Sequence, residues 1–105
     1  MNFGSRKIEV SRLPEIDGFD ESRIESALNT SFGKFEKLFG PGISLKVHFK
    51  QHETGGKRAK HSVHVKLFSA HKTLFSEEAG WVLADAVQKA LKVLEREALK
   101  ELGKN

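Results

Sequence analysis

The chain has 105 residues, the size of one ordinary domain, and 18 Lys and Arg against 14 Asp and Glu give a formal net charge of +4. It has no cysteine, which excludes disulfides, thiol catalysis and Cys-ligated zinc. No apolar run approaches the ~20 residues that span a bilayer, and no secretory signal opens the chain, so we expect one cytoplasmic domain over residues 1–105 without membrane association. The positive net charge indicates a polyanionic partner.

Two elements are predicted in the first part of the chain. Residues 6–12 alternate polar and apolar side chains, which indicates a short strand. Asp20 is the expected N-cap of a helix over residues 21–39, where apolar side chains recur at three- and four-residue steps. The segment Gly40-Pro41-Gly42 ends this helix, since glycine tolerates the cap conformation and proline cannot continue the hydrogen bonding.

Three further strands follow. Residues 43–50 alternate with a period of two, so their apolar side chains share the core face. Residues 51–58 contain two adjacent glycines and are predicted to form a hairpin loop. The matching strand covers residues 62–68, and residues 72–76 form a short fourth strand.

The last element is a helix. Ser76, Glu77 and Glu78 are the expected start, since a hydroxyl cap followed by acids suits the positive end of the helix dipole. Trp81 is expected to anchor the first turn, and the helix ends near Leu102. The order β-α-β-β-β-α predicts an α+β two-layer sandwich with one four-stranded sheet and two helices on one face. The last three strands are expected to be antiparallel, with the first parallel to a neighbour.

Cations recur on both predicted helices. Lys34 and Lys37 lie three residues apart on one flank of the first helix. The last helix carries a row of cations on one flank: Lys89, Lys92, Arg96 and Lys100. A row of this kind facing a phosphate backbone would release counterions and gain salt-sensitive affinity. The alternative is a solvated helix face whose cations pair with nearby acids.

The predicted hairpin supplies a second set of cations. The two strands of this hairpin carry no acid on their outward face. The outward ring of Phe68 could receive an unstacked base of RNA. The alternatives are an ordinary polar hairpin tip and lysines that protect a bare sheet from aggregation. We expect this set to join the helix cations in one continuous RNA-binding surface. The set is Lys46, His48, Lys50, Lys57, Arg58, Lys60, His64 and Lys66.

The sequence contains no pattern typical of catalysis. It lacks a nucleophile elbow, a P-loop and a dinucleotide fingerprint. The five histidines do not follow a zinc-ligand spacing. We therefore expect no catalytic residue, no metal, no cofactor and no small-molecule substrate.

Two helix motifs resemble those of the ribosome hibernation-promoting factors, also called ribosome-associated translation inhibitors. Residues 34–38 (Lys-Phe-Glu-Lys-Leu) match the Lys-Phe-x-Lys-Leu run of that family. Ala86-Val87, Leu94-Glu95-Arg96 and Lys100 resemble its last helix, whereas Gln88 and Val93 depart from it. The motifs contain Lys34, Lys37, Arg96 and Lys100, and Lys89 and Lys92 join them only by helical geometry.

The resemblance implies a function without turnover. Such proteins bind the rRNA of the small ribosomal subunit in the channel used by mRNA and tRNA, which inhibits translation and preserves idle ribosomes. The chain would resemble the short form of the family and would be a monomer off the ribosome.

Two other functions remain open. A double-stranded-RNA-binding domain has a nearly identical element order, but its last helix starts with lysines, where Glu77 and Glu78 are expected here. A protein-interaction module could use the exposed sheet face, and its association would be insensitive to salt. A metal-dependent hydrolase is a third and more distant possibility.

Overall fold

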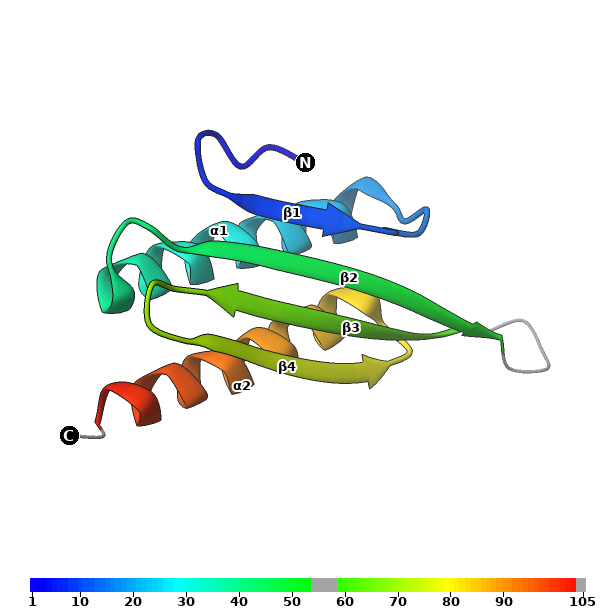
Figure 1. Ribbon diagram of the computed structural model, residues 1–105. Helices are drawn as coiled ribbons and strands as arrows, with labels where there is room; N and C mark the ends of the chain where they lie inside the picture. Colours follow the sequence, from blue (N-terminus) through cyan, green and yellow to red (C-terminus); the bar gives the residue numbers. More distant parts are fainter. Residues whose placement is uncertain (54–58, 104–105) are drawn as a thin grey trace.

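The described residues form four strands and two helices, in the order predicted from the sequence (Figure 1). The computed structural model describes residues 1–53 and 59–103. The strand order is β1-β2-β3-β4, with β1 parallel to β2 and the other neighbours antiparallel. The elements are β1 (Ile8–Ser11), α1 (Gly18–Phe39), β2 (Ser44–Glu53), β3 (Ala59–Phe68), β4 (Thr73–Gly80) and α2 (Leu83–Leu102).

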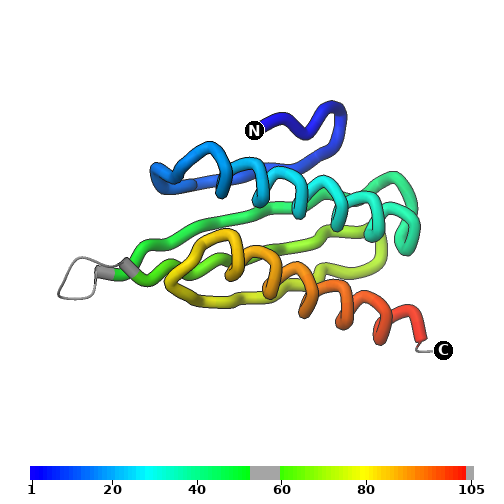
Figure 2. Tube along the Cα trace, turned by 180° about the vertical axis from the view of Figure 1, so that it is seen from behind, coloured from blue at the N-terminus to red at the C-terminus, as the bar shows by residue number. Residues whose placement is uncertain are grey.

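Both helices cover the same face of the sheet, which confirms the predicted two-layer sandwich (Figure 2). The opposite face of the sheet carries no helix, as Figure 1 shows from the front. The molecule is thin, with principal extents of 49 × 28 × 17 Å. Every side chain of the sheet therefore points either into the apolar layer beneath the helices or out from the uncovered face.

The apolar layer follows directly from the sequence periods. Phe35 of α1, Phe49 of β2 and Leu94 of α2 are at most 1% exposed. Burying a side chain of this size stabilises the fold by about 1.5–3 kcal/mol relative to leaving it in water. The alternation in β2 and β3 continues the same layer across the sheet. Its strand residues are Leu45, Val47, Phe49, Val63, Val65 and Leu67.

The start of α1 differs from the prediction. Asp17 is the N-cap, with extended backbone angles of φ −72° and ψ 163°, and its carboxylate Oδ1 accepts a hydrogen bond from the Asp20 amide at 2.7 Å. Asp20 was predicted in this role, but it lies inside the first turn. The sequence offers two aspartates three residues apart, and the apolar period does not distinguish which of them precedes the first turn.

The predicted start of the last helix is wrong by several residues. Ser76, Glu77 and Glu78 belong to β4, because the ten-residue β3 pairs with this segment as far as Gly80. The Ser76 hydroxyl does not cap a helix but donates to the Ala90 carbonyl of α2 at 2.8 Å. Main-chain pairing along an available strand edge has therefore prevailed over a local capping signal.

α2 consequently begins at Leu83, with Val82 at the N-cap and no side-chain capping hydrogen bond. Trp81 was expected in the first helical turn, but it precedes the helix and is 47% exposed. The central hairpin is also longer than predicted, since β2 continues to Glu53 and β3 begins at Ala59.

The alternative N-caps of α1 can be tested by substitution. Asp17→Ala removes the capping acceptor and is expected to lower the free energy of unfolding by about 1 kcal/mol. Asp20→Ala removes only a first-turn charge and a 3.6 Å contact with Arg23, so it should change that energy by less than about 0.5 kcal/mol. Urea unfolding midpoints of the two variants decide the matter, and an equal loss in both would contradict this assignment.

Candidate nucleic-acid interface

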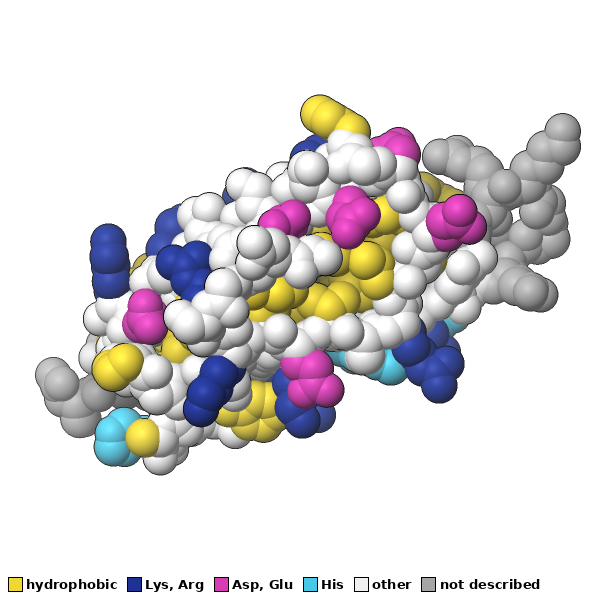
Figure 3. All heavy atoms as spheres, turned by 90° about the horizontal axis from the view of Figure 1, so that it is seen from above, with side chains coloured by type: hydrophobic (Ala, Val, Ile, Leu, Met, Phe, Trp, Pro, Cys, Tyr) yellow, Lys and Arg dark blue, Asp and Glu magenta, His cyan; other side chains and the backbone are white. Residues whose placement is uncertain are grey.

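The structure divides the predicted cations between two opposite sides of the molecule. The expectation of one continuous surface is wrong, because the apolar layer forces the helix cations and the outward strand cations apart. Figure 3, seen from the side of β1, shows Lys and Arg side chains along both long rims, with carboxylates between them. The helix surface comprises Lys34, Lys37, Lys89, Lys92, Arg96 and Lys100. The sheet surface comprises Lys46, His48, Lys50, Lys60, His64 and Lys66.

On α2 the predicted row of cations lies on one exposed flank. Two of its members have carboxylate neighbours: Lys89 lies 3.9 Å from Glu78 of β4, and Lys100 lies 3.6 Å from Glu97. Lys92 and Arg96 have no carboxylate within 4 Å in the described part of the chain. The centre of the row therefore carries the more available positive charge.

The two lysines of α1 differ in the same way. Lys34 Nζ lies 3.1 Å from Glu95 Oε1 of α2, which ties the two helices together. Lys37 is exposed and forms no ion pair with a described carboxylate. Beside them is a hollow of about 380 Å³ that Leu38 and Leu99 also line, and Leu99 is 59% exposed.

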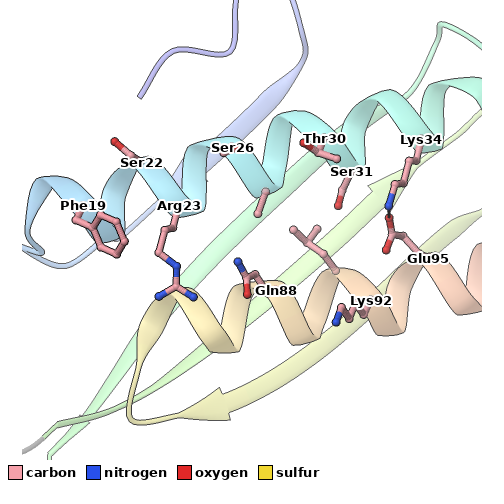
Figure 4. A pocket seen from close by; sticks show the side chains of 12 residues that line it. Phe19, Ser22, Arg23, Ser26, Thr30, Ser31, Lys34, Gln88, Lys92 and Glu95 are labelled. Atoms are coloured by element: carbon pink, nitrogen blue, oxygen red, sulfur yellow. Dashed lines mark ion pairs between the residues drawn. The ribbon is translucent and has the colours of Figure 1, made fainter.

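A groove of about 600 Å³ runs between the helices (Figure 4). Figure 4 shows Lys34 and Glu95 meeting across it, while Arg23 reaches from α1 toward the start of α2. The Arg23 guanidinium donates to Asp85 Oδ1 at 2.8 Å, so this cation is engaged.

The rim of the groove on α1 carries hydroxyls that sequence reasoning missed. Ser22, Ser26 and Thr30 line the groove and lead to Lys34. Their four-residue spacing was a visible signal, because it places them on one helix face. Hydroxyls of this kind can donate to phosphate oxygens, so the groove extends the helix surface.

On the sheet surface, the hairpin register aligns like residues. Lys46 lies opposite Lys66, and His48 lies opposite His64 with ring centroids 6.4 Å apart. As predicted, no acidic side chain occupies an outward position of β2 from Ser44 to Lys50 or of β3 from Lys60 to Phe68. Four exposed or half-exposed basic side chains therefore meet at the centre of the uncovered face.

The edge strands add acids that the sequence analysis did not place on this face. Glu9 of β1 lies 3.9 Å from Lys46, and Glu77 of β4 lies 3.4 Å from Nε2 of His64. Glu77 was missed because it was assigned to the last helix. Its position on β4 became clear only from the pairing of that strand with β3.

Other polar groups fix the histidines and extend the sheet surface. The Ser11 hydroxyl and His48 Nδ1 are 2.8 Å apart, and His52 Nε2 lies 3.0 Å from the Ser62 hydroxyl. Arg12, which sequence reasoning did not select, lines a hollow of about 640 Å³ with His48 and Lys50. The parallel pairing of β1 with β2 brings it there.

Two predicted cations, Lys57 and Arg58, lie outside the described residues. Within residues 1–53 and 59–103, no group of three or more His, Asp or Glu side chains could hold a metal ion. None of the described helices is long and apolar enough to cross a membrane.

The contrast with double-stranded-RNA-binding domains now has a different basis. Glu77 and Glu78 lie on β4, so they do not begin the last helix. The first turn of α2 instead contains Asp85, and the first lysine of the helix is Lys89. The lysine cluster at the helix start remains absent, for a reason different from the one expected.

The pairing pattern predicts which cations contribute most to polyanion affinity. Lys92→Gln and Arg96→Gln remove charges without a carboxylate neighbour, and each is expected to lower the salt concentration at which the protein elutes from heparin. Lys89→Gln and Lys100→Gln each remove a charge that Glu78 or Glu97 already offsets, so the decrease should be smaller. Equal decreases in all four variants would show that these ion pairs do not reduce the contribution of Lys89 and Lys100 to polyanion affinity.

The fold matches two solved structures at low sequence identity. The "Thermus thermophilus Protein Y N-terminal domain" superposes with a TM-score of 0.59 and 16% identity, covering 91% of this chain and 97% of that one. A "ribosomal subunit interface protein from Coxiella burnetii" gives a TM-score of 0.61 and 17% identity, covering 92% and 98%. At these identities the likeness shows the fold.

The family follows from the sequence comparison. No curated protein matches this chain significantly. The model of the "Hibernation factor Hib, C-terminal domain" matches residues 7–105, which include both helices and all four strands. The chain therefore belongs to the hibernation factor family, through a domain that corresponds to the C-terminal domain of Hib.

Proposed function

We propose that the domain binds rRNA of the small ribosomal subunit and blocks the channel for mRNA and tRNA. Membership of the hibernation factor family is the observation that carries this proposal. The similar protein from Coxiella burnetii is described as a ribosomal subunit interface protein, which supports a site between the subunits. The proposed result is inhibited translation and preserved idle ribosomes in the cytoplasm.

The distribution of charge supports contact with RNA on two sides. Cations lie on the helix surface and on the sheet surface of a molecule whose shortest extent is 17 Å. Ribosomal RNA surrounds its channels, so an occupant with cations on opposite sides can bind phosphates on both walls. Neither surface alone would use all of the basic side chains.

The mechanism is steric and needs no chemical step. Phosphate contacts from Lys92, Arg96 and Lys37 would hold the domain in place, and affinity would fall as salt concentration rises. Inhibition would then depend on the number of domains per subunit. This behaviour distinguishes the proposal from an enzyme, which would act at a small fraction of one domain per ribosome.

Co-sedimentation with purified small subunits tests the two surfaces. Lys92→Glu combined with Arg96→Glu reverses the helix surface, and Lys50→Glu combined with Lys66→Glu reverses the sheet surface. Each double variant changes the net charge by the same amount, and each should lower binding at least tenfold at low salt. Wild-type binding should itself weaken as salt increases.

A triple variant elsewhere serves as the matched control. Lys7→Glu combined with Ala70→Glu and His71→Glu makes the same change in net charge, with His71 counted as neutral, at three exposed positions outside both surfaces. It should retain more binding than either double variant. If wild type does not sediment with small subunits, the proposal fails, and equal losses in all three variants would mean that the binding is non-specific electrostatic attraction.

Steric exclusion makes a further prediction about order of addition. Subunits already loaded with mRNA and tRNA should bind the domain poorly, and saturating domain should prevent later loading by tRNA. Inhibition of in vitro translation should level off near one domain per small subunit. Simultaneous binding of tRNA and the domain to the same subunit would contradict a blocked channel.

A further inference from the structure

A strongly exposed aromatic ring lies on the largely polar sheet surface. Phe75 of β4 is 72% exposed, and its neighbours along the strand, Leu74 and Ser76, point into the molecule. In the described part of the chain no aromatic ring or cation packs on Phe75. Its ring is therefore accessible to a flat partner from the solvent side.

The neighbours of Phe75 are basic. Lys66 of β3 is its direct partner in the strand register, and Lys46 of β2 is the partner of Lys66. The Lys46 ammonium lies 5.7 Å from the ring centroid of Phe68, so that second ring is already covered by a cation. Directly opposite residues have Cβ atoms about 4.5–5.5 Å apart, which places Lys66 beside the Phe75 ring.

We propose that Phe75 and Lys66 form a binding site for an unpaired RNA nucleotide. The base stacks on the Phe75 ring, and the Lys66 ammonium contacts the phosphate of the same or the adjacent nucleotide. This inference rests on the proposed RNA-binding function and assigns the sheet surface a separate role within it. Aromatic rings on open sheets bind single strands in this way because every base has a flat π-face.

The local charges favour a nucleotide over an apolar protein segment. Around Phe75 the cross-strand positions supply Lys66 and Lys46, while Glu77 on the same strand and face lies beside His64. A single exposed ring among lysines offers little area to an apolar partner, but it satisfies both parts of a nucleotide. A duplex would not fit the site, since its bases are stacked on one another.

Binding of short RNA strands tests the site directly. Fluorescence anisotropy would compare a labelled single-stranded oligoadenylate with an abasic strand of the same length and charge. The wild-type protein should prefer oligoadenylate, because only that strand can stack. Phe75→Ala should weaken oligoadenylate binding by about 5- to 150-fold and abolish the preference, the range expected for loss of one stacked base.

Two control variants separate stacking from apolar contact and from general damage. Phe75→Leu keeps an apolar side chain but removes the ring, so it should lose the preference nearly as fully as Phe75→Ala. Leu102→Ala removes an apolar side chain that is 46% exposed at the end of α2, and it should leave the preference unchanged. Circular dichroism of each variant should match wild type, because Phe75 and Leu102 are both exposed.

Salt dependence distinguishes the roles of the ring and the lysine. Lys66→Gln should reduce the slope of log affinity against log salt by about 0.7, the value for one phosphate contact to a single strand. Phe75→Ala should lower affinity at every salt concentration without changing that slope. Opposite behaviour of the two variants would overturn the assignment of ring to base and lysine to phosphate.

The outcome is separable from that of the proposed function. If wild-type protein binds small subunits but shows no preference for oligoadenylate over the abasic strand, the nucleotide site is wrong and the ribosomal function stands. The site is also wrong if Phe75→Leu keeps the full preference. If oligoadenylate binds as proposed but small subunits do not, the ribosomal proposal fails while the site remains.

Discussion

The apolar layer between the sheet and the helices determines where the charges of this molecule can lie. Because α1 and α2 pack on the same face, their polar sides point away from the sheet, and the outward side chains of β2 and β3 point the opposite way. The fold therefore keeps two basic surfaces apart by the thickness of its own core. No rearrangement of side chains could merge them, since the buried rings of Phe35 and Phe49 lie between.

This separation changes how the positive charge is used. Several cations lie beside a carboxylate, as Lys34 does beside Glu95 and Lys46 beside Glu9, and such exposed pairs add little stability. They also offset part of the field that attracts a phosphate backbone. The cations without such a neighbour in the described part of the chain include Lys37, Lys92 and Arg96 on one side and Lys50 and Lys66 on the other.

Periodicity in the sequence was sufficient to predict the layers of the fold. The alternation in β2 and β3 and the apolar stripes of the helices depend on burial, which the pattern records directly. The boundaries of helices and strands were harder to predict, because they depend on competition between local capping signals and the pairing of strands. Ser76 illustrates this, since its hydroxyl is a good cap by type but bonds to the Ala90 carbonyl once β4 pairs with β3.

The candidate interface was predictable in composition but not in arrangement. Helical spacing correctly grouped Lys92 with Arg96 on one exposed flank. It could not reveal that Glu77 would join His64, or that Arg12 would lie near Lys50, because both depend on which strands become neighbours. Sequence separation hides such relations until the order of strands in the sheet is known.

The short first strand also bears on the dynamics of the uncovered face. β1 has four residues, pairs only with β2, and meets it across a long connection, as the 37-residue separation of Ser11 and His48 shows. Edge strands of this kind detach at a lower free-energy cost than central ones. When β1 opens, Glu9 and Ser11 leave together, and Lys46 and His48 lose their neighbours. Transient fraying of one edge would thus raise the positive potential of the adjoining strand.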